Sequence, residues 1–299
     1  MNVTDIEIRK LEMHAIELRE SVINMLLHAK SGHTAGPLGM ADIFAALYFK
    51  ILKHDPENTS WAHRDRLILS NGHICPIMYA AMAHSGYFDI NQLLTLRKFG
   101  SKLQGHPHRE FLSSLETSSG PLGCGLSQTI GMAIVDRHTK NNNKRDISGL
   151  GYVAKMFYCI MGDGEMNEGN VWEALLLLGK EKLSNVIVIV DRNNIQLDGK
   201  TEDIMPLNPL AHKLDKFNLN VIEIDGNNMR QICEAFSMAK NNSIIENGKA
   251  TVIVANTIPG KGYTKIEGDY KWHGKAPNQK EADEAIESMR TLYGRLNNT

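Results

Sequence analysis

The chain has 299 residues, of which 42% are hydrophobic and 22% charged, a composition typical of globular proteins. Its formal net charge of -1, without a block of like charges, excludes nucleic acid and anionic membranes as expected partners. The N-terminus lacks the pattern of a secretory signal, and no apolar run approaches the roughly 20 residues that span a bilayer. The four cysteines are isolated, which favours a reducing compartment. We therefore expect a cytoplasmic protein without a membrane segment.

A long first helix is predicted at residues 6–29, where apolar side chains recur at spacings of three and four. The following stretch, SGHTAGPLGM, contains three glycines and a proline that break the helical period. A second apolar helix is expected to begin at Ala41. The glycine-rich loop between the two helices is the first candidate site.

Five short apolar runs predict buried strands, at residues 66–70, 156–161, 185–190, 219–224 and 250–258. Helical patterns at 125–140, 170–182 and 228–240 separate most of them, and a closing amphipathic helix is expected at 280–296. This alternation predicts a single α/β domain over residues 1–299, with a doubly wound, mainly parallel sheet and helices on both faces. Ligands of such sheets bind beyond the carboxyl ends of the strands, so the loops there should carry the chemistry.

An aspartate between two glycines follows the run at 156–161. Gly162 and Gly164 would let a bulky anionic group approach the backbone closely. A phosphate beside the Asp163 carboxylate requires a cation between the two, and Mg²⁺ typically binds one or two protein carboxylates together with phosphate oxygens. Asp163 is therefore a candidate metal ligand.

The next run ends in further oxygen donors. Asn193 offers an amide oxygen thirty positions after Asp163, and Asp191 directly follows the apolar run. Asp-Gly and Asn-Asn pairs are also common in turns, and that interpretation stays open for either loop alone. Their occurrence at two successive strand ends favours a shared metal site.

GDG with an asparagine about thirty residues later resembles the thiamine diphosphate signature, and the resemblance to transketolases extends along nearly the whole chain. SGHTAGPLGMADI resembles the family's SGHPGAPLGMADI, LSNGH its SxGH, LQGHP its GHP and SSGPLGCGLS its TGPLGQG, and KWHGKAP follows near the end. The resemblance implies a thiamine diphosphate-binding fold. It also implies that Asp163, Asn193 and the backbone oxygen of Ile195 bind Mg²⁺ or another divalent cation such as Ca²⁺ or Mn²⁺.

Four histidines lie in these motifs, and the resemblance implies a role for each. His33 and His273 would contact the reacting hydroxyl groups and assist proton transfer, His73 would approach the cofactor diphosphate, and His106 would bind the terminal hydroxyl of the donor. Imidazole suits such transfers because it titrates near neutral pH. The further cofactor contacts that the family implies are Gly120, Leu122, Gly162, Gly164, Ile258 and His273.

Two glutamates after GDG are candidates for subunit coupling. In the family, the glutamate that matches Glu168 lies at a subunit contact and helps to link paired active sites, and Glu173 follows in the same predicted helix. Acidic side chains near a helix start also interact favourably with the helix dipole, so a purely structural role for these glutamates stays open. The chain departs from the family pattern at Thr34, Ala35, His108 and Cys124, beside the substrate-facing histidines, which puts the sugar preference in doubt.

A full-length transketolase is much longer than this chain and contains pyrimidine-binding and C-terminal domains. The resemblance therefore implies the N-terminal subunit of a split transketolase, with those domains on a partner chain. The partner would supply the glutamate that activates the cofactor, in an α₂β₂ assembly. The expected activity is transfer of a two-carbon ketol unit from a ketose phosphate to an aldose phosphate, with no turnover by the isolated chain.

Three alternatives remain. One is a related enzyme of specialised sugar catabolism. Another is the α subunit of a 2-oxo acid dehydrogenase, which also places GDG and the asparagine on a separate chain but would not be expected to carry SGHTAGPLGMADI or KWHGKAP. The third is a non-catalytic, cofactor-binding subunit, against which the presence of all four histidines and both metal-binding side chains argues.

Overall fold

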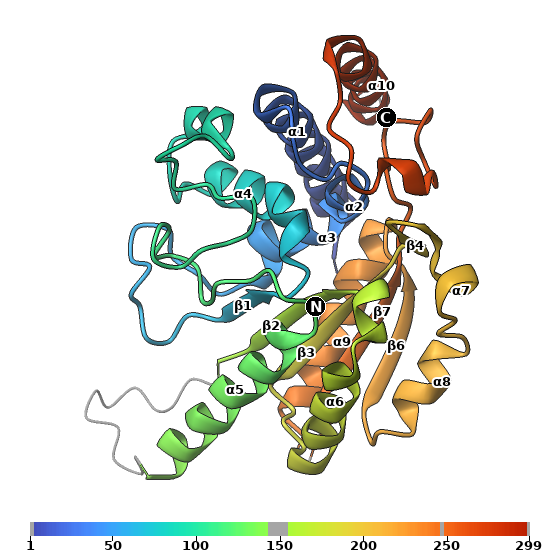
Figure 1. Ribbon diagram of the computed structural model, residues 1–299. Helices are drawn as coiled ribbons and strands as arrows, with labels where there is room; N and C mark the ends of the chain where they lie inside the picture. The colour runs from blue at the N-terminus through green and yellow to red at the C-terminus, as the bar shows by residue number, and fades with distance from the viewer. Residues whose placement is uncertain (1–2, 143–154, 246–247, 298–299) are drawn as a thin grey trace.

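Five parallel strands form the central sheet (Figure 1) in a computed structural model that describes residues 3–142, 155–245 and 248–297. Their order is β1-β2-β3-β7-β6. In chain order they span Arg66–Leu69, Phe157–Gly162, Val186–Arg192, Asn220–Asp225 and Thr251–Asn256. They match the five apolar runs to within two residues at either end, and every pairing is parallel. The predicted parallel sheet is therefore confirmed.

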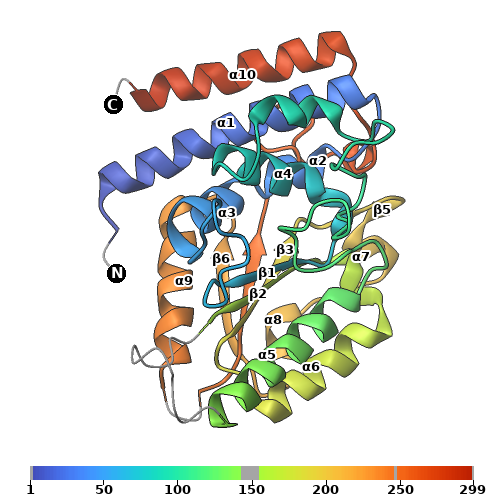
Figure 2. The same ribbon diagram turned by 90° about the vertical axis from the view of Figure 1, so that its left-hand side faces the viewer.

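Helices cover both faces of the sheet, as Figure 2 shows. One group comprises α1 (Asp5–Ala29), α3 (Ala41–Ala46), α4 (Cys75–His84) and α9 (Met229–Ser243), and the other comprises α5 (Cys124–Asn142), α6 (Gly169–Glu181) and α8 (Leu210–Asp215). Successive side chains of a strand point to opposite faces. Accordingly, Tyr158 and Ile160 join the core under the first group, whereas Phe157, Cys159 and Met161 join the core under the second.

The first and last helices pack against each other on the outer side of α3 and α4 (Figure 2). Helix α10 (Gln279–Asn297) lies along α1 in both ribbon views and corresponds to the predicted closing helix (Figures 1 and 2). Thr4 begins α1 with a capping box, in which its hydroxyl accepts the N–H of Glu7 and the Glu7 carboxylate accepts the N–H of Thr4. The helix ends at Lys30, which adopts a left-handed conformation.

The glycine-rich stretch after α1 was expected to be a loop but contains a short buried helix, α2 (Ala35–Gly39). Pro37 is compatible with it because the first N–H groups of a helix need no partner within the helix. A Cβ at Gly39 would lie 2.9 Å from the carbonyl oxygen of Ile258. The glycine therefore allows α2 to pack directly on the backbone that follows β7. Helix α3 continues into a π-helical turn, η1 (Leu47–Ile51).

Short elements follow several strand ends. A two-stranded antiparallel hairpin, β4 (Ile195–Gln196) and β5 (Gly199–Lys200), leads into α7 (Thr201–Ile204). Four 3₁₀ turns complete the described elements: η2 (Gly72–Ile74), η3 (Ile90–Thr95), η4 (Gly164–Asn167) and η5 (Tyr270–Trp272). None of the helices in the described ranges combines the length and apolar character needed to cross a membrane.

Candidate active site

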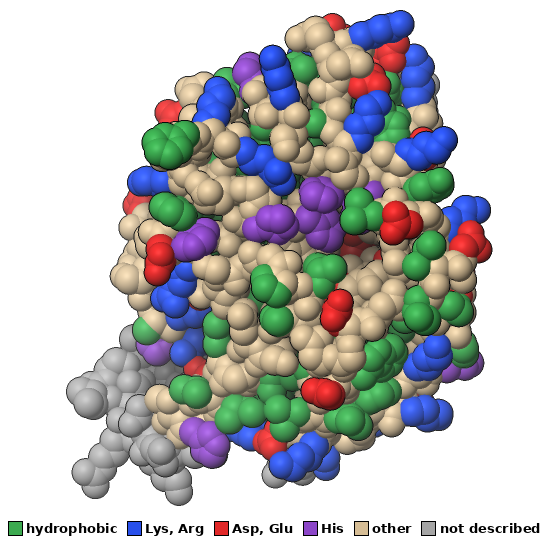
Figure 3. Space-filling model, viewed as in Figure 1, with side chains coloured by type: hydrophobic (Ala, Val, Ile, Leu, Met, Phe, Trp, Pro, Cys, Tyr) green, Lys and Arg blue, Asp and Glu red, His purple; other side chains and the backbone are tan. Residues whose placement is uncertain are grey.

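A cavity of about 460 Å³ lies at the carboxyl ends of β1, β2 and β3. Figure 3 shows histidine side chains gathered at the centre of the face on which it opens. The lining residues are His33, Asn71, His73, His106, Gly120, Leu122, Gly162, Asp163, Gly164, Glu165, Asn193, Ile195, Gln196, Leu197, Asp198 and His273. The cavity thus brings together most of the side chains that the sequence motifs singled out.

The register of the sheet explains why Asp163 and Asn193 meet. Gly162, the last residue of β2, pairs with Asp191 near the end of β3. Each candidate metal ligand lies just beyond its strand, so the two face the same space at one edge of the sheet. The hairpin that begins at Ile195 forms the next part of the wall.

Three histidines from distant segments form a compact cluster. The ring centroids of His33 and His73 are 4.9 Å apart, those of His73 and His273 5.1 Å, and those of His33 and His273 5.5 Å. Nδ1 of both His33 and His273 is buried without a hydrogen-bond partner. Thr34 secures the arrangement, because its hydroxyl donates a 2.5 Å hydrogen bond to the carbonyl oxygen of Lys275.

Burial keeps these imidazoles neutral near pH 7. Desolvation, followed by the nearby His273 and Arg97, lowers the pKa of His33 from 6.5 to about 4. Burial and the neighbouring His33 lower the pKa of His73 well below its ordinary value, and burial alone lowers that of His273. The pKa of His106 is lowered by burial and by Arg97. A neutral ring offers one donor and one acceptor nitrogen, which suits exchange of protons with hydroxyl groups.

Asp163 is 1% exposed and uses its two oxygens differently. Oδ2 accepts hydrogen bonds from Arg192 (2.9 Å), the N–H of Asn194 (2.9 Å) and the hydroxyl of Thr201 (3.2 Å). Oδ1 accepts one bond, of 2.7 Å, from the N–H of Gly164. Burial raises the pKa of Asp163, and Arg192 with the two backbone N–H groups opposes that rise. Oδ1 is thus the oxygen with capacity left for a cation.

Asn193 is oriented by its neighbours. Its Nδ2 donates to Oδ2 of Asp191 over 2.8 Å, and its Oδ1 accepts the N–H of Ile195 over 3.0 Å. Asp191 is held in turn by the hydroxyl of Thr257, and burial raises its pKa to about 7. The amide oxygen therefore faces away from Asp191 and toward Ile195.

Sequence reasoning missed three polar residues of the site. Arg192 forms ion pairs with both Asp163 and Glu202, and its Nη2 lies 2.6 Å from Oε1 of Glu202. Asn71 is 1% exposed and its Oδ1 has no partner. Glu165 is 3% exposed, and burial raises its pKa against three hydrogen bonds that lower it. The local sequence gave one signal, a second acidic residue directly after GDG.

Three predicted residues lie outside the cavity lining. Ile258 follows β7 and is 38% exposed, with its N–H bonded to Asn227. Glu168 is the exposed N-cap residue of α6, without a side-chain cap bond, and Glu173 lies exposed farther along that helix. Of the residues that depart from the family pattern, Thr34 is buried beside His33 and Cys124 begins α5, 3.8 Å from Nδ2 of Asn170.

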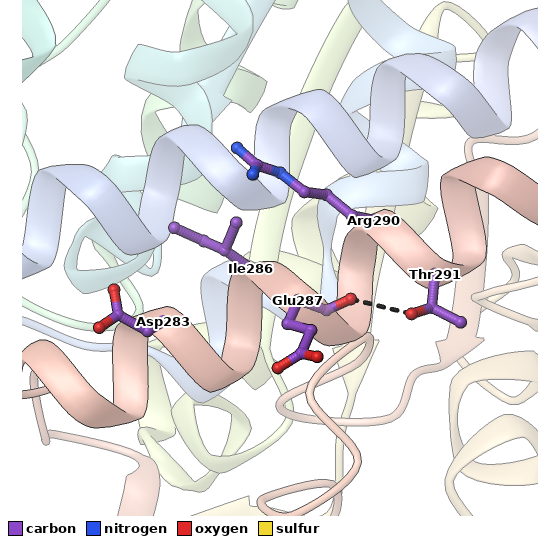
Figure 4. A pocket seen from close by; sticks show the side chains of 5 residues that line it. All are labelled: Asp283, Ile286, Glu287, Arg290 and Thr291. Atoms are coloured by element: carbon purple, nitrogen blue, oxygen red, sulfur yellow. Dashed lines mark hydrogen bonds between the residues drawn. The ribbon is translucent and has the colours of Figure 1, made fainter.

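A second hollow, of about 600 Å³, lies along α10 (Figure 4). Its lining residues are Asp283, Ile286, Glu287, Arg290 and Thr291. The hydroxyl of Thr291 bonds to the carbonyl oxygen of Glu287 one turn earlier, a contact internal to the helix. Because all of its lining comes from one helix surface, this hollow lacks the converging polar groups of the cavity at the strand ends.

Comparison with known proteins identifies the family. Residues 11–298 match the family described as transketolase, thiamine diphosphate binding domain. The chain is 36% identical over 293 residues to an apulose-4-phosphate transketolase subunit of Actinobacillus succinogenes, covering 97% of this chain and 99% of the relative. It is also 36% identical over 263 residues to a 6-deoxy-6-sulfo-D-fructose transketolase subunit of Clostridium sp., covering 88% and 90%.

A solved structure agrees with these sequence matches. The structure of transketolase from Campylobacter jejuni superposes with a TM-score of 0.84 at 32% identity, covering 97% of this chain and 43% of the other. The chain thus spans less than half the length of that transketolase, while it spans nearly all of the subunit relatives. The protein therefore belongs to the transketolase family, whose thiamine diphosphate binding domain it represents.

Proposed function

We propose that the chain is the N-terminal subunit of a split transketolase, which transfers a two-carbon ketol unit from a ketose phosphate to an aldose phosphate. The convergence of His33, His73 and His273 on the cavity that also contains Asp163 and Asn193 carries this inference. A phosphate and metal site alone would need no cluster of neutral imidazoles. Proton exchange with sugar hydroxyls does need one.

The residues of the cavity fit thiamine diphosphate with a divalent cation. Oδ1 of Asp163, the amide oxygen of Asn193 and the carbonyl oxygen of Ile195 are the oxygen ligands that Mg²⁺, Ca²⁺ or Mn²⁺ would use. A Cβ at Gly164 would lie 3.0 Å from Cγ of Gln196, so the glycine allows the hairpin to pack closely beside Asp163. The unpartnered Oδ1 of Asn71 leaves a polar contact available to a ligand.

The chain's own side chains would bind and exchange protons. When bound, the cofactor supplies the carbon centre that carries the ketol group. His33 and His273 would move protons at the reacting hydroxyls, and His106 would bind the terminal hydroxyl of the donor. His73 would face the diphosphate. Gly120 and Leu122 would form the wall against the cofactor rings, with Ile258 as a more distant apolar contact.

A partner chain would complete the site. Helices α5 and α6 are neighbours and carry exposed apolar side chains: Val135 is 65% exposed, Leu176 63% and Leu177 40%. Clusters of exposed apolar side chains commonly mark contact surfaces. Glu168 and Glu173 lie exposed on α6 and would couple the subunits there. On this hypothesis residues 1–299 are one cofactor-binding domain. The pyrimidine-binding and C-terminal domains and the activating glutamate belong to the partner, in an α₂β₂ assembly.

Two classes of sugar substrate are candidates for this subunit. The relatives named above act, by their names, on apulose 4-phosphate and on 6-deoxy-6-sulfo-D-fructose, so a specialised sugar pathway is an alternative to the pentose phosphates. Thr34 and His108 flank the substrate-facing histidines and are the residues whose change would alter this choice. All four cysteines are free and three are buried, in keeping with a reducing, cytoplasmic compartment.

Reconstitution tests the function. Ketol transfer from xylulose 5-phosphate to ribose 5-phosphate would be followed with thiamine diphosphate and Mg²⁺, first with the chain alone and then with the product of an adjacent gene. We expect activity in the mixture and none from the chain alone. Turnover by the isolated chain would contradict the split-transketolase hypothesis. A cofactor-bound mixture without activity would direct the search to apulose 4-phosphate and sulfonated sugars, which would be assayed next.

A further inference from the structure

A single buried carboxylate joins the end of β2 to two loops of the cavity. Oε1 of Glu165 accepts the hydroxyl of Ser70 and, over 2.6 Å, the N–H of Gly123. Its Oε2 accepts the N–H of Gly162 over 3.1 Å. The Ser70 hydroxyl also accepts the N–H of Gly125 over 3.0 Å, which extends the network into the first turn of α5. The three donors to Glu165 come from different parts of the chain.

These loops are the ones that carry the candidate cofactor contacts. Ser70 follows β1 and lies three positions before His73. Gly123 directly follows Leu122, and Gly162 directly precedes Asp163. Fixing the three anchor points therefore fixes the relative placement of a diphosphate contact, a ring contact and a metal ligand.

The network requires an acceptor on both oxygens. Gly123 has a φ of +82°, and a Cβ there would lie 2.1 Å from Oδ1 of Asn170, so the backbone at this turn has little freedom to find another partner. Two backbone N–H groups and a hydroxyl converge on Glu165, and a buried N–H without an acceptor is costly. A glutamine would keep one acceptor oxygen and would turn an NH₂ group toward a donor.

We infer that Glu165 is a positioning residue that holds the loops after β1 and β2 and the loop before α5 in the arrangement that receives the cofactor. The inference rests on the proposed function, since thiamine diphosphate is the expected ligand. Pre-arranged loops lower the cost of ordering on binding, so loss of the carboxylate should weaken binding of the cofactor more than it slows the reaction of the loaded enzyme.

Asp65 offers a matched control at the other end of the same strands. It is 5% exposed and accepts two backbone bonds of 2.9 Å, from the N–H groups of Lys53 and Met156. Asp65→Asn therefore removes a buried carboxylate with similar partners, far from the carboxyl edge of the sheet. Both variants should lower the unfolding temperature, because each leaves a backbone donor facing an NH₂ group.

The experiment compares Glu165→Gln with Asp65→Asn in the reconstituted complex. The apparent Kd for thiamine diphosphate at fixed Mg²⁺ is measured by tryptophan fluorescence, together with kcat at saturating cofactor. Loss of a residue that orients ligands typically costs about 10- to 100-fold in affinity. We expect a rise of that size for Glu165→Gln, with kcat largely restored at saturation, and an unchanged Kd for Asp65→Asn.

An unchanged Kd for Glu165→Gln, or an equal rise for Asp65→Asn, would overturn the inference. If Glu165→Gln does not fold, Ser70→Ala removes one contact of the network and should still raise the Kd. Binding of thiamine diphosphate by the wild-type complex distinguishes a failure of the proposed function from a failure of the positioning role. Failure of the wild type to bind the cofactor would overturn the proposed function itself, whereas normal binding by both wild type and variant would overturn the positioning role alone.

Discussion

Nη1 of Arg192 lies 2.9 Å from Oδ2 of Asp163, and the two side chains are 4% and 1% exposed. Both members of the ion pair are therefore shielded from water. The pair occupies Oδ2, which also accepts the N–H of Asn194 and the hydroxyl of Thr201, whereas Oδ1 accepts, among the described residues, only the N–H of Gly164. The proposed metal ligand is thus held in place by a positively charged side chain of the protein itself.

Removing Arg192 should destabilise the fold. Arg192→Met leaves the Asp163 carboxylate unpaired in the interior, and breaking a buried pair in this way costs about 3–5 kcal/mol. The free energy of unfolding, from urea titration, checks the value. The double variant Arg192→Met, Asp163→Asn should recover much of the loss, because it removes the uncompensated charge. A double variant as unstable as the sum of the single ones would show that the two side chains do not interact.

Binding of the divalent cation should depend on the cofactor. Asp163 provides a single carboxylate, and Mg²⁺ sites of this kind are completed by phosphate oxygens. Chelation with EDTA should therefore release thiamine diphosphate and abolish activity, and Mg²⁺, Ca²⁺ or Mn²⁺ should restore both. Asp163→Asn should not be restored by Mg²⁺ at concentrations that saturate the wild type.

Asp225→Asn is the matched control for this metal experiment. Asp225 ends β6 at the same edge of the sheet, is exposed and lies outside the cavity lining. Its substitution should leave cofactor binding and activity as in the wild type. Tight binding of Mg²⁺ to the wild-type chain in calorimetry without any cofactor would contradict the expected dependence.

Loss of His33 or His273 should slow the reaction of the cofactor-loaded enzyme. His33→Ala and His273→Ala remove proton-transfer groups, and such losses typically lower kcat by about 10²- to 10⁴-fold. His84→Gln serves as control, because His84 also has a pKa lowered by burial but bonds to Ser21 outside the cavity. Full activity of both alanine variants in the complex would support a non-catalytic, cofactor-binding subunit instead.

The burial of His33 should lower the stability of the fold as the pH falls from about 6.5 toward 4. The folded-state pKa of His33 is about 4, against 6.5 for the free group. Between these values the unfolded chain binds a proton that the folded chain does not, so the free energy of unfolding rises with pH in this window. Asp191, with its pKa raised to about 7, contributes the opposite slope. Urea midpoints of wild type and His33→Gln between pH 4.5 and 7 isolate the histidine, because the variant should lack the rise in stability with pH that His33 contributes.

A charge on α6 should block assembly. Leu176 is 63% exposed, and Leu176→Glu would place a carboxylate in the proposed contact with the partner chain. Truncating or charging a central contact typically costs at least about 2 kcal/mol, or roughly 30-fold in Kd. Met238→Glu on α9, where Met238 is 58% exposed, is the control on a different helix. Equal affinity of both variants for the partner, measured by sedimentation, would move the contact away from α6.

The sequence was informative wherever chemistry is local. Apolar runs predict strands because the inner strands of a parallel sheet are covered on both faces, as β2, β3 and β7 are, and Asp163 and Asn193 directly follow two of these strands. Glu165 and Arg192 could not be recognised in this way. Ser70, which donates to Glu165, is 95 positions away in sequence, and Asp163, which pairs with Arg192, is 29 positions away. Only the folded backbone brings these partners together. Helix α2 was not predicted because its glycines and proline break the helical period of the sequence. These residues are nevertheless compatible with a short first turn that packs closely on its neighbours.

The hydrogen bond from Thr34 to the carbonyl oxygen of Lys275 joins positions 241 residues apart. Contacts of such separation require closure of a very long loop and are intrinsically slow to form. During synthesis, the segment of His33 leaves the ribosome long before that of His273. The cluster can therefore exist only once nearly the whole chain has been made and folded, and a nascent or truncated chain presents no complete binding pocket. Uptake of the cofactor would thus report that the subunit has finished folding.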